Sequence, residues 1–381
     1  MENATSVAVT VYQSDNYSYI FSHYVSQLNM LTAMPAKSPV LGDIEYNEFV
    51  RRWLEFSLMI CLSLIGTFGN IHTILVYARV EEMNQRFHVR TLITWLSVVD
   101  LITCFAVMPF ETVTIRLNYS VSSNEACKLF RFIGHTTIMS SWLLLTVIAH
   151  ERYRKIYSIF LGNHSSPKKG NKITSWLKSK STFFQQNVVC TFIIILSVIV
   201  SSPLFVFLGI VTVPVTLNNT GLSGTQCTTH RQYRGKLTAG LYAGIVGLFG
   251  LSCFIYCSYC YGKILYLIRK QSEKEKKRKE NNFKLRGKLN KIQRNPSYNK
   301  RKPNFMVTIS LIAATGLSVC GFILFSIGIA IVVSESALTN AVITSVLLRG
   351  CFINNACNPV VYFIFDNQFR HACKKLYIKQ T

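Results

Sequence analysis

The sequence predicts an all-α membrane protein, a bundle of seven transmembrane helices followed by a short amphipathic eighth helix. Half of the 381 residues are hydrophobic and only 15% are charged, whereas a soluble domain carries roughly a quarter charged residues. Seven apolar runs each reach or exceed the ~20 residues that a helix needs to cross a bilayer. These runs span about 53–79, 91–116, 129–150, 184–212, 238–268, 305–333 and 338–364.

The charges between the runs predict which helix ends face the cytoplasm. The net charge is +24, and the basic residues gather in the segments after the third and fifth runs. Residues 269–302 hold 15 Lys and Arg against 3 Glu, whereas residues 1–52 hold only three basic side chains. Loops rich in Lys and Arg stay on the cytoplasmic side. We therefore expect a multi-pass plasma-membrane protein with an extracellular N-terminus and a cytoplasmic C-terminus, and no nucleic acid as a partner.

This orientation divides the chain into three parts. We expect an extracellular tail at 1–52, the helix bundle at 53–364 with a third cytoplasmic loop at about 269–304, and an amphipathic helix with a cytoplasmic tail at 365–381. Four glycosylation sequons fall on the segments expected outside. They begin at Asn3, Asn16, Asn118 and Asn218.

Two motifs mark the third and seventh runs. Cys127 opens the third helix, and Glu151-Arg152-Tyr153 closes it, with 25 positions from Cys127 to Arg152. Asn358-Pro359-Val360-Val361-Tyr362 lies at the inner end of the seventh helix. Together these motifs resemble those of the rhodopsin-like (class A) G-protein-coupled receptors, over about 53–377. The resemblance implies a receptor, and no enzyme, that binds an extracellular ligand and activates a heterotrimeric G protein.

The resemblance implies roles for residues at the inner end. Arg152, flanked by Glu151 and Tyr153, matches an arginine that is restrained in the inactive state of family members and contacts the G protein in their active state. Tyr261 of the fifth helix matches the tyrosine that turns toward this arginine on activation. The seventh helix contributes Asn358, Pro359 and Tyr362 to the same activation machinery.

A polar centre is expected inside the bundle. An ionised carboxylate such as Asp100 is costly in mid-membrane, so it is usually functional. In the family this aspartate holds an allosteric sodium ion, and no other cofactor is implied. The matching polar positions here are Asn70, Asp100, Ser141, Asn354 and Asn358.

Cysteine positions predict one disulfide. Of the twelve cysteines, only Cys127 and Cys227 lie at positions expected outside. Because that compartment is oxidising, we expect them to pair, as they do in the family.

Four positions depart from the family pattern. Gly321 and Ile323 stand where the sixth helix usually has Trp and Pro, and we expect Gly321 to supply flexibility there. Cys253 replaces a proline of the fifth helix, and Pro303 stands where many members have an acidic partner for the arginine. Which contacts stabilise the inactive state is therefore open.

Pro109 is expected to kink the second helix near its outer end.

Two classes of ligand can be excluded from single residues. Gly134 stands where amine receptors have Asp, and Phe352 stands where opsins have the retinal-binding Lys. A peptide or neuropeptide is favoured by the 52-residue tail and the disulfide-linked second loop. The candidate ligand-pocket residues are Glu111, Gly134, His135 and Arg349. Glu111 is suited to pair with a basic residue of the peptide, although each polar group here also fits an interfacial role.

Other functions stay open or are disfavoured. A lipid or nucleotide ligand, and a signalling-poor decoy or scaffold receptor, remain alternatives. A transporter is disfavoured because the helices hold essentially one buried acid and no internal repeat. Arrestin and membrane lipid are further expected partners.

Overall fold

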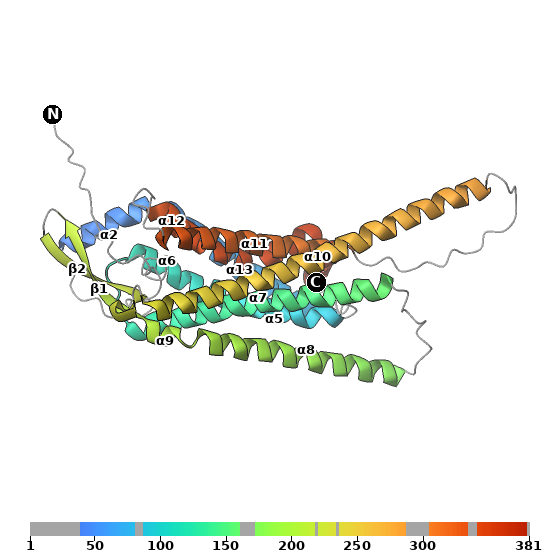
Figure 1. Cartoon of the computed structure of the whole chain (residues 1–381), viewed down its shortest axis with the longest axis horizontal. Coiled ribbons are helices and arrows are strands. Elements are labelled where there is room, and N and C mark those ends of the chain that lie inside the picture. Colours follow the sequence, from blue (N-terminus) through green and yellow to red (C-terminus); the bar gives the residue numbers. More distant parts are fainter. Residues whose placement is uncertain are drawn as a thin grey trace, which may run out of the picture.

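Within the residues that the computed structural model describes, seven helical segments lie side by side along one axis (Figure 1). The described residues are 39–80, 87–160, 172–217, 220–233, 236–286, 305–333 and 341–378. Four segments are single helices: α3 (Trp53–Arg79), α7 (Asn124–Phe160), α10 (Leu237–Arg286) and α11 (Phe305–Val333).

The other three segments are interrupted. The second consists of α5 (Phe87–Ile102), the π-helical η2 (Thr103–Val107) and α6 (Met108–Arg116). The fourth consists of α8 (Lys172–Ser201) and α9 (Leu204–Phe207). The seventh consists of α12 (Ala341–Leu348), the 3-10 turn η4 (Arg349–Cys351) and α13 (Phe352–Phe365).

The outward faces of the helices are apolar, as a lipid-facing bundle requires. Phe192, Ile199 and Leu248 are among many large hydrophobic side chains that stay exposed. Among the described residues, six helices are long and apolar enough to cross a membrane. The seventh segment consists of pieces of 8, 3 and 14 residues, so no single piece reaches that length. Its 25 residues together still do, and the expected seven-helix bundle is confirmed.

The distortion of the second helix lies just before Pro109, in the π-helical turn η2. Proline has no N–H to donate to the preceding turn, so the helical ladder must change near it. Thr103 occupies this turn, and its Oγ1 donates to Thr137 Oγ1 of α7 at 2.8 Å. The turn therefore keeps a polar contact with the third helix where the backbone pattern changes.

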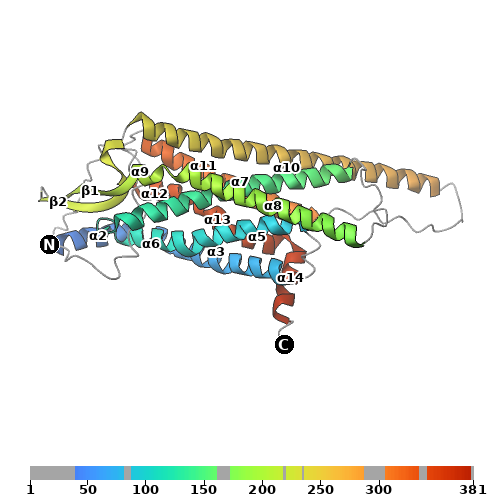
Figure 2. The same ribbon diagram turned by 90° about the horizontal axis from the view of Figure 1, so that it is seen from below.

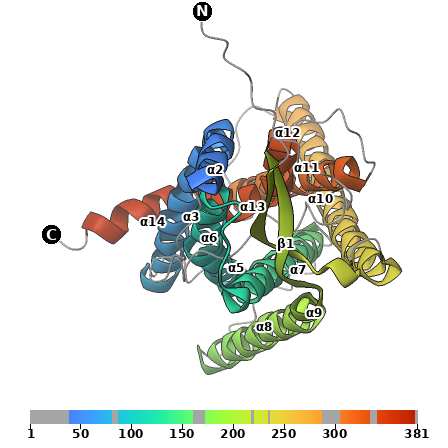
Figure 3. The same ribbon diagram turned by 90° about the vertical axis from the view of Figure 1, so that its left-hand side faces the viewer.

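The fourth helix ends earlier than predicted. We expected it to reach about 212, but Leu208–Leu217 form strand β1, which pairs antiparallel with β2 (Thr220–Thr229). The end of the apolar run was misread because Ile210, Val211 and Thr212 are β-branched residues that suit a strand. The hairpin crosses one end of the bundle (Figure 3). We call this end, which also carries Cys127, the disulfide end.

The opposite end, which carries Arg152, is called the arginine end. There α10 runs on to Arg286, so residues 269–286, expected as loop, continue the helix past the bundle (Figure 1). Good helix formers such as Lys and Glu dominate this stretch. Lys270 and Lys274 lie over the ring of Phe160, at 5.9 and 5.3 Å from its centroid. These contacts tie the extension to the end of α7.

Two short helices flank the bundle. The last residues of the expected extracellular tail form α2 (Pro39–Arg51), which lies at the disulfide end. Its Glu45 is buried and accepts hydrogen bonds from Tyr119 N at 2.8 Å and Ser120 Oγ at 2.6 Å. At the other end α14 (Asn367–Ile378) turns away from the bundle axis (Figure 2). It occupies the position of the predicted eighth helix.

Candidate functional site: a polar column inside the helix bundle

Asp100 of α5 is the centre of a hydrogen-bonded cluster between three helical segments. Its side chain is fully buried. Ser141 Oγ donates to Oδ1 at 2.8 Å, Asn355 Nδ2 donates to Oδ1 at 2.7 Å, and Asn358 Nδ2 donates to Oδ2 at 2.7 Å. Hydrogen bonds to a charged group contribute about 1.5–3 kcal/mol each, which offsets part of the cost of burying the carboxylate. The cluster joins α5, α7 and α13.

The prediction from the sequence included most of this cluster but named the wrong asparagine. It named Asn354, whose Oδ1 accepts a short hydrogen bond from Ser318 Oγ of α11. The asparagine that donates a hydrogen bond to Asp100 is its neighbour Asn355. Asn70 contacts the cluster through the backbone, because its Nδ2 donates to the carbonyl of Asn355 at 3.0 Å. Adjacent asparagines point to different helices, which a motif comparison alone does not resolve.

The atoms around Asp100 fit a sodium ion. Sodium takes oxygen ligands, and Asp100 and Ser141 supply a carboxylate and a hydroxyl. Asn355 Oδ1 is buried beside them, and no described residue donates a hydrogen bond to it. An unsatisfied buried acceptor next to a carboxylate is suited to a small cation.

Arg152 lies at the arginine end of α7 and is 6% exposed. Its guanidinium interacts electrostatically with the hydroxyl groups of Tyr261 and Tyr362, both of which are buried. Tyr261 also shares a long 3.5 Å hydrogen bond with Thr315 of α11. The structure thus gathers the arginine and the two tyrosines that the sequence singled out, from α7, α10 and α13.

The neighbours of Arg152 in the sequence point elsewhere. Glu151 Oε1 accepts a hydrogen bond from Arg154 Nη1 at 3.0 Å, on the surface. The Tyr153 ring centroid lies 6.5 Å from that of Tyr259, so the ring packs between α7 and α10.

Pro359 lies inside α13 and packs closely on Gly69 of α3. A Cβ added to Gly69 would lie only 2.7 Å from Pro359 Cβ. Pro303 lies outside the described residues.

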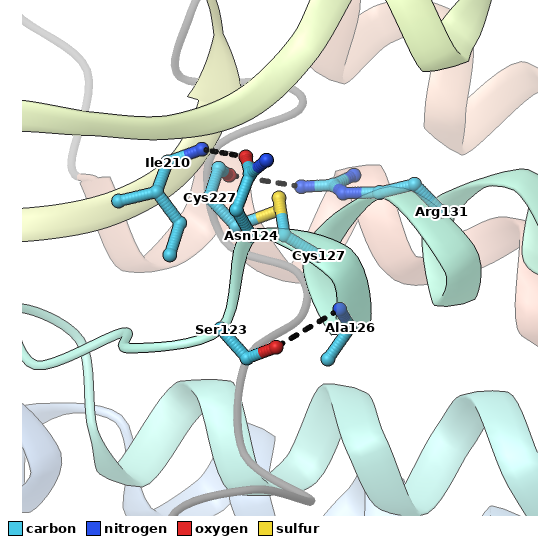
Figure 4. Close-up of a disulfide and its surroundings, with 7 residues drawn as sticks. All are labelled: Ser123, Asn124, Ala126, Cys127, Arg131, Ile210 and Cys227. Atoms are coloured by element: carbon cyan, nitrogen blue, oxygen red, sulfur yellow. Dashed lines mark hydrogen bonds between the residues drawn. A yellow bond between two sulfur atoms is a disulfide. The ribbon is translucent and has the colours of Figure 1, made fainter.

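A disulfide joins α7 to the hairpin. Cys127 and Cys227 are bonded, with 5.7 Å between their Cα atoms (Figure 4). Asn124 Oδ1 accepts a hydrogen bond from the Ile210 amide at 3.1 Å, and Ile210 pairs with Cys227 across the hairpin. Arg131 Nη2 donates to the Cys227 carbonyl at 3.5 Å. Both strands of the hairpin are therefore fixed to the start of α7.

Five buried side chains near this end alternate in charge. Arg52 Nε donates to Glu55 Oε2 at 2.9 Å, and Glu55 also forms a short ion pair with Arg349. Arg349 Nε lies 3.8 Å from Glu111 Oε2, and Glu111 interacts electrostatically with Arg131. We call Arg52, Glu55, Arg349, Glu111 and Arg131 the charge chain. The sequence had suggested Glu111 and Arg349 but not the other three, because hydropathy places Arg52 and Glu55 at a helix start where exposed charges are common.

The two remaining pocket candidates differ in role. His135 Nδ1 lies 2.8 Å from Ser201 Oγ, and its ring centroid is 6.1 Å from that of Tyr242. It therefore sits between α7, α8 and α10. A Cβ on Gly134 would lie 3.0 Å from Val107 Cγ1, so this glycine allows close packing of α7 on η2.

Gly321 provides close packing where the sequence had suggested flexibility. A Cβ there would lie 2.5 Å from the carbonyl oxygen of Gly350, so α11 and η4 touch backbone to backbone. A tryptophan at this position has no room. The bundle's large aromatic contact lies instead around Trp142 of α7, whose ring is 5.8 Å from Phe254 and 5.4 Å from Phe322.

One glycosylation candidate lies within the described residues. Asn118 is only 7% exposed, which does not favour attachment of a bulky glycan. Asn3, Asn16 and Asn218 lie outside the described residues.

Comparisons with known proteins agree with this architecture. The chain matches the family described as 7 transmembrane receptor (rhodopsin family) over residues 69–362. It is 26% identical to neuropeptide Y receptor type 6 of Mus musculus over 230 residues, which is 58% of this chain and 56% of that receptor. It is 24% identical to the gonadotropin-releasing hormone II receptor of Clarias gariepinus over 318 residues, 81% of this chain and 74% of that protein.

Shorter matches also occur. Neuropeptide Y receptor type 5 of Rattus norvegicus is 25% identical over 133 residues, 35% of this chain and 29% of that receptor. The chain thus spans about half the length, or less, of the neuropeptide Y receptors it matches. The family match, by contrast, covers most of the chain and includes Asp100, Arg152 and the seventh-helix motif. This chain belongs to the rhodopsin family of seven-transmembrane receptors.

Proposed function

We propose that this chain is a plasma-membrane receptor that binds an extracellular peptide at the disulfide end and activates a heterotrimeric G protein at the arginine end. Its N-terminus lies outside the cell and its C-terminus inside. One observation carries the proposal. The 37-residue helix α7 is continuous, and it bears Cys127 at one end, Ser141 at the polar centre and Arg152 near the other.

A peptide is the favoured ligand class. Two relatives are named as receptors for neuropeptide Y and one as a receptor for gonadotropin-releasing hormone. The disulfide end also presents backbone edges and polar side chains from α2, the hairpin and α7, which suit an extended ligand.

The mechanism is a shift between two states of the bundle. A ligand that binds one conformation better increases its population. Movement of α10 and α11 then changes the packing around Arg152, Tyr261 and Tyr362, and opens this end to the G protein. Arrestin would use the same end, and α14 would rest on lipid headgroups.

Sodium binding at Asp100 would oppose this shift. Asp100, Ser141 and Asn355 would hold the ion between α5, α7 and α13. A cation there stabilises the charge of Asp100 and the contacts among these three helices.

The test is G-protein activation in cells that express the chain, using pooled neuropeptides and a parallel arm of lipids and nucleotides. Arg152→Ala removes the buried guanidinium. Arg154→Ala is the matched control, because Arg154 lies two positions away with its side chain 66% exposed. We expect a peptide response that Arg152→Ala abolishes and Arg154→Ala preserves.

Two results would contradict the proposal. A response only to lipids or nucleotides would assign a different ligand class. Silence in every pool, with the receptor verified at the cell surface, would favour a decoy or scaffold receptor.

A further inference from the structure

A hydrogen bond joins α7 to α10 close to Arg152. His150 Nδ1 lies 2.7 Å from the hydroxyl oxygen of Tyr256. The two rings also stack, with 6.1 Å between their centroids and 24° between their planes. His150 stands two positions before Arg152 on the same helix. The contact therefore holds α10 beside the residue that is proposed to reach the G protein.

The pair lies on the outward face of the bundle, among apolar side chains. His150 ends the apolar run 129–150, and Tyr256 lies inside the run 238–268. Tyr256 is 39% exposed, and its neighbour Ile255 on α10 is also exposed. Lipid tails cannot form hydrogen bonds, so a polar group on this face depends on the protein for a partner. The hydroxyl of Tyr256 finds that partner on α7.

The hydrogen bond belongs to a row of contacts between the two helices. Cys257 Sγ donates to Thr146 Oγ1 at 3.6 Å, one turn before His150 on α7. The Tyr153 ring, one turn after it, packs on the ring of Tyr259. Residues three and four positions apart share a helix face, so the row is continuous along α7. Thiols are weak donors, which makes the contact of His150 the strongest polar contact of the row.

The row is closed in a structure that buries the arginine. Arg152 is 6% exposed, and Tyr261, five positions after Tyr256 on α10, is also buried. In the proposed mechanism α10 and α11 move and open this end of the bundle. Movement of α10 away from α7 would separate His150 from Tyr256. A contact that is made in only one of two states favours that state.

We propose that His150 and Tyr256 form a latch that favours the state with Arg152 buried and so limits signalling in the absence of ligand. This deepens the proposed function and rests on it, because the latch sets the equilibrium that the ligand shifts. Both are positioning residues, which act on the signal through the placement of α10. Loss of the hydrogen bond should therefore increase the population of the open state.

The first test measures agonist-independent G-protein activation at equal surface expression. Tyr256→Phe removes the hydroxyl and keeps the ring. We expect activation to rise roughly three-fold, the size of effect that hydrogen bonds between membrane helices have on an equilibrium. Tyr259→Phe is the matched control, because the ring of Tyr259 makes the contact with Tyr153, and it should match the wild type. If the wild type signals but Tyr256→Phe leaves its basal activity unchanged or lower, the latch is wrong.

A second variant isolates the bond between the helices. The Tyr256 hydroxyl also contacts the Cys260 thiol on its own helix, and His150→Phe leaves that contact in place. We expect His150→Phe to raise basal activity as Tyr256→Phe does, and the double variant to match either single one, because all three lose the same bond. Increases that multiply in the double variant would show that the two residues act separately, against the proposal.

A further measurement separates the latch from the proposed function, because it needs neither ligand nor G protein. Hydrogen–deuterium exchange is followed on the purified full chain in residues 150–160 of α7 and 256–274 of α10. We expect faster exchange in Tyr256→Phe than in the wild type and Tyr259→Phe, since local opening exposes amides to water. If no variant activates a G protein but this exchange still increases, the receptor proposal fails and the latch stands. Equal exchange in all three proteins would overturn the latch, even where a peptide activates the receptor.

Discussion

At the scale of single residues, Asp100 is the centre of the buried polar cluster. One carboxylate accepts three hydrogen bonds from two other helical segments. The sequence predicted its importance because an intramembrane acid is rarely neutral to function. It did not predict Asn355, since the choice between Asn354 and Asn355 depends on how α13 is rotated against α5 and α11.

Two substitutions of Asp100 should behave differently. Asp100→Asn keeps an acceptor for Ser141 and Asn355, and the Asn358 amide can rotate to meet the new amide. Asp100→Ala removes the acceptor of three hydrogen bonds, although Asn355 Nδ2 still donates to Ser141 Oγ at 3.3 Å. Each buried donor left unpaired costs about 1–3 kcal/mol. We expect a clearly lower unfolding midpoint for Asp100→Ala than for Asp100→Asn, measured by thermal unfolding of purified receptor. Equal midpoints would show that the three hydrogen bonds contribute little.

The same residue gives a prediction about sodium. Replacing sodium by choline in the buffer should lower the unfolding midpoint of the wild type, because a bulky quaternary ammonium cannot form the close contacts with carboxylate, hydroxyl and amide oxygens that sodium forms. Asp100→Asn should abolish the difference between the two salts, since it removes the charge that attracts the ion. A sodium effect that persists in this variant would place the ion elsewhere.

At the scale of elements, helix positions followed from hydropathy, but their ends and interruptions did not. Hydropathy cannot distinguish the end of α9 from the apolar, β-branched start of β1. It also cannot show that α10 continues to Arg286, because a charged helix and a charged loop have similar composition. The charge chain was missed for a related reason, since its members are far apart in sequence and meet only after the helices pack.

The contact between α11 and η4 explains the missing tryptophan of the sixth helix. Gly321→Ala places a methyl group against the Gly350 carbonyl, and overpacking of this kind costs about 1–3 kcal/mol. Gly316→Ala is the control on the same helix, where a Cβ meets nothing within 4 Å. We expect only Gly321→Ala to lower the unfolding midpoint. A similar small effect from both changes would mean that the close approach of the two backbones is not required.

The disulfide should matter for the hairpin and hence for the ligand. It links residues 100 positions apart, and closing a loop of this length contributes several kcal/mol, up to about 5, in the chain-entropy view. The double change Cys127→Ser and Cys227→Ser should therefore reduce surface expression and agonist potency together. The free cysteine Cys61, exposed on α3, supplies the control substitution Cys61→Ser. Normal potency in the double variant would remove the hairpin from the ligand site.

At the scale of the whole molecule, three clusters follow one another along α7. The disulfide and Arg131 lie at one end, Ser141 meets Asp100 in the middle, and Arg152 lies near the other end. The sequence predicted the first and last of these clusters from two motifs at a fixed spacing, Cys127 and Arg152. It left the ligand chemistry open, because the side chains at the disulfide end come from several helices and the hairpin, which meet only in the folded chain.

The most direct test measures ligand binding and G-protein activation on the same cells. With an agonist from the peptide pools, Arg152→Ala should keep binding near the wild-type level and lose activation, whereas Arg154→Ala should keep both. This result would show that Arg152 transmits a signal received at the opposite end. Full activation by the Arg152→Ala receptor at equal surface expression would contradict the account.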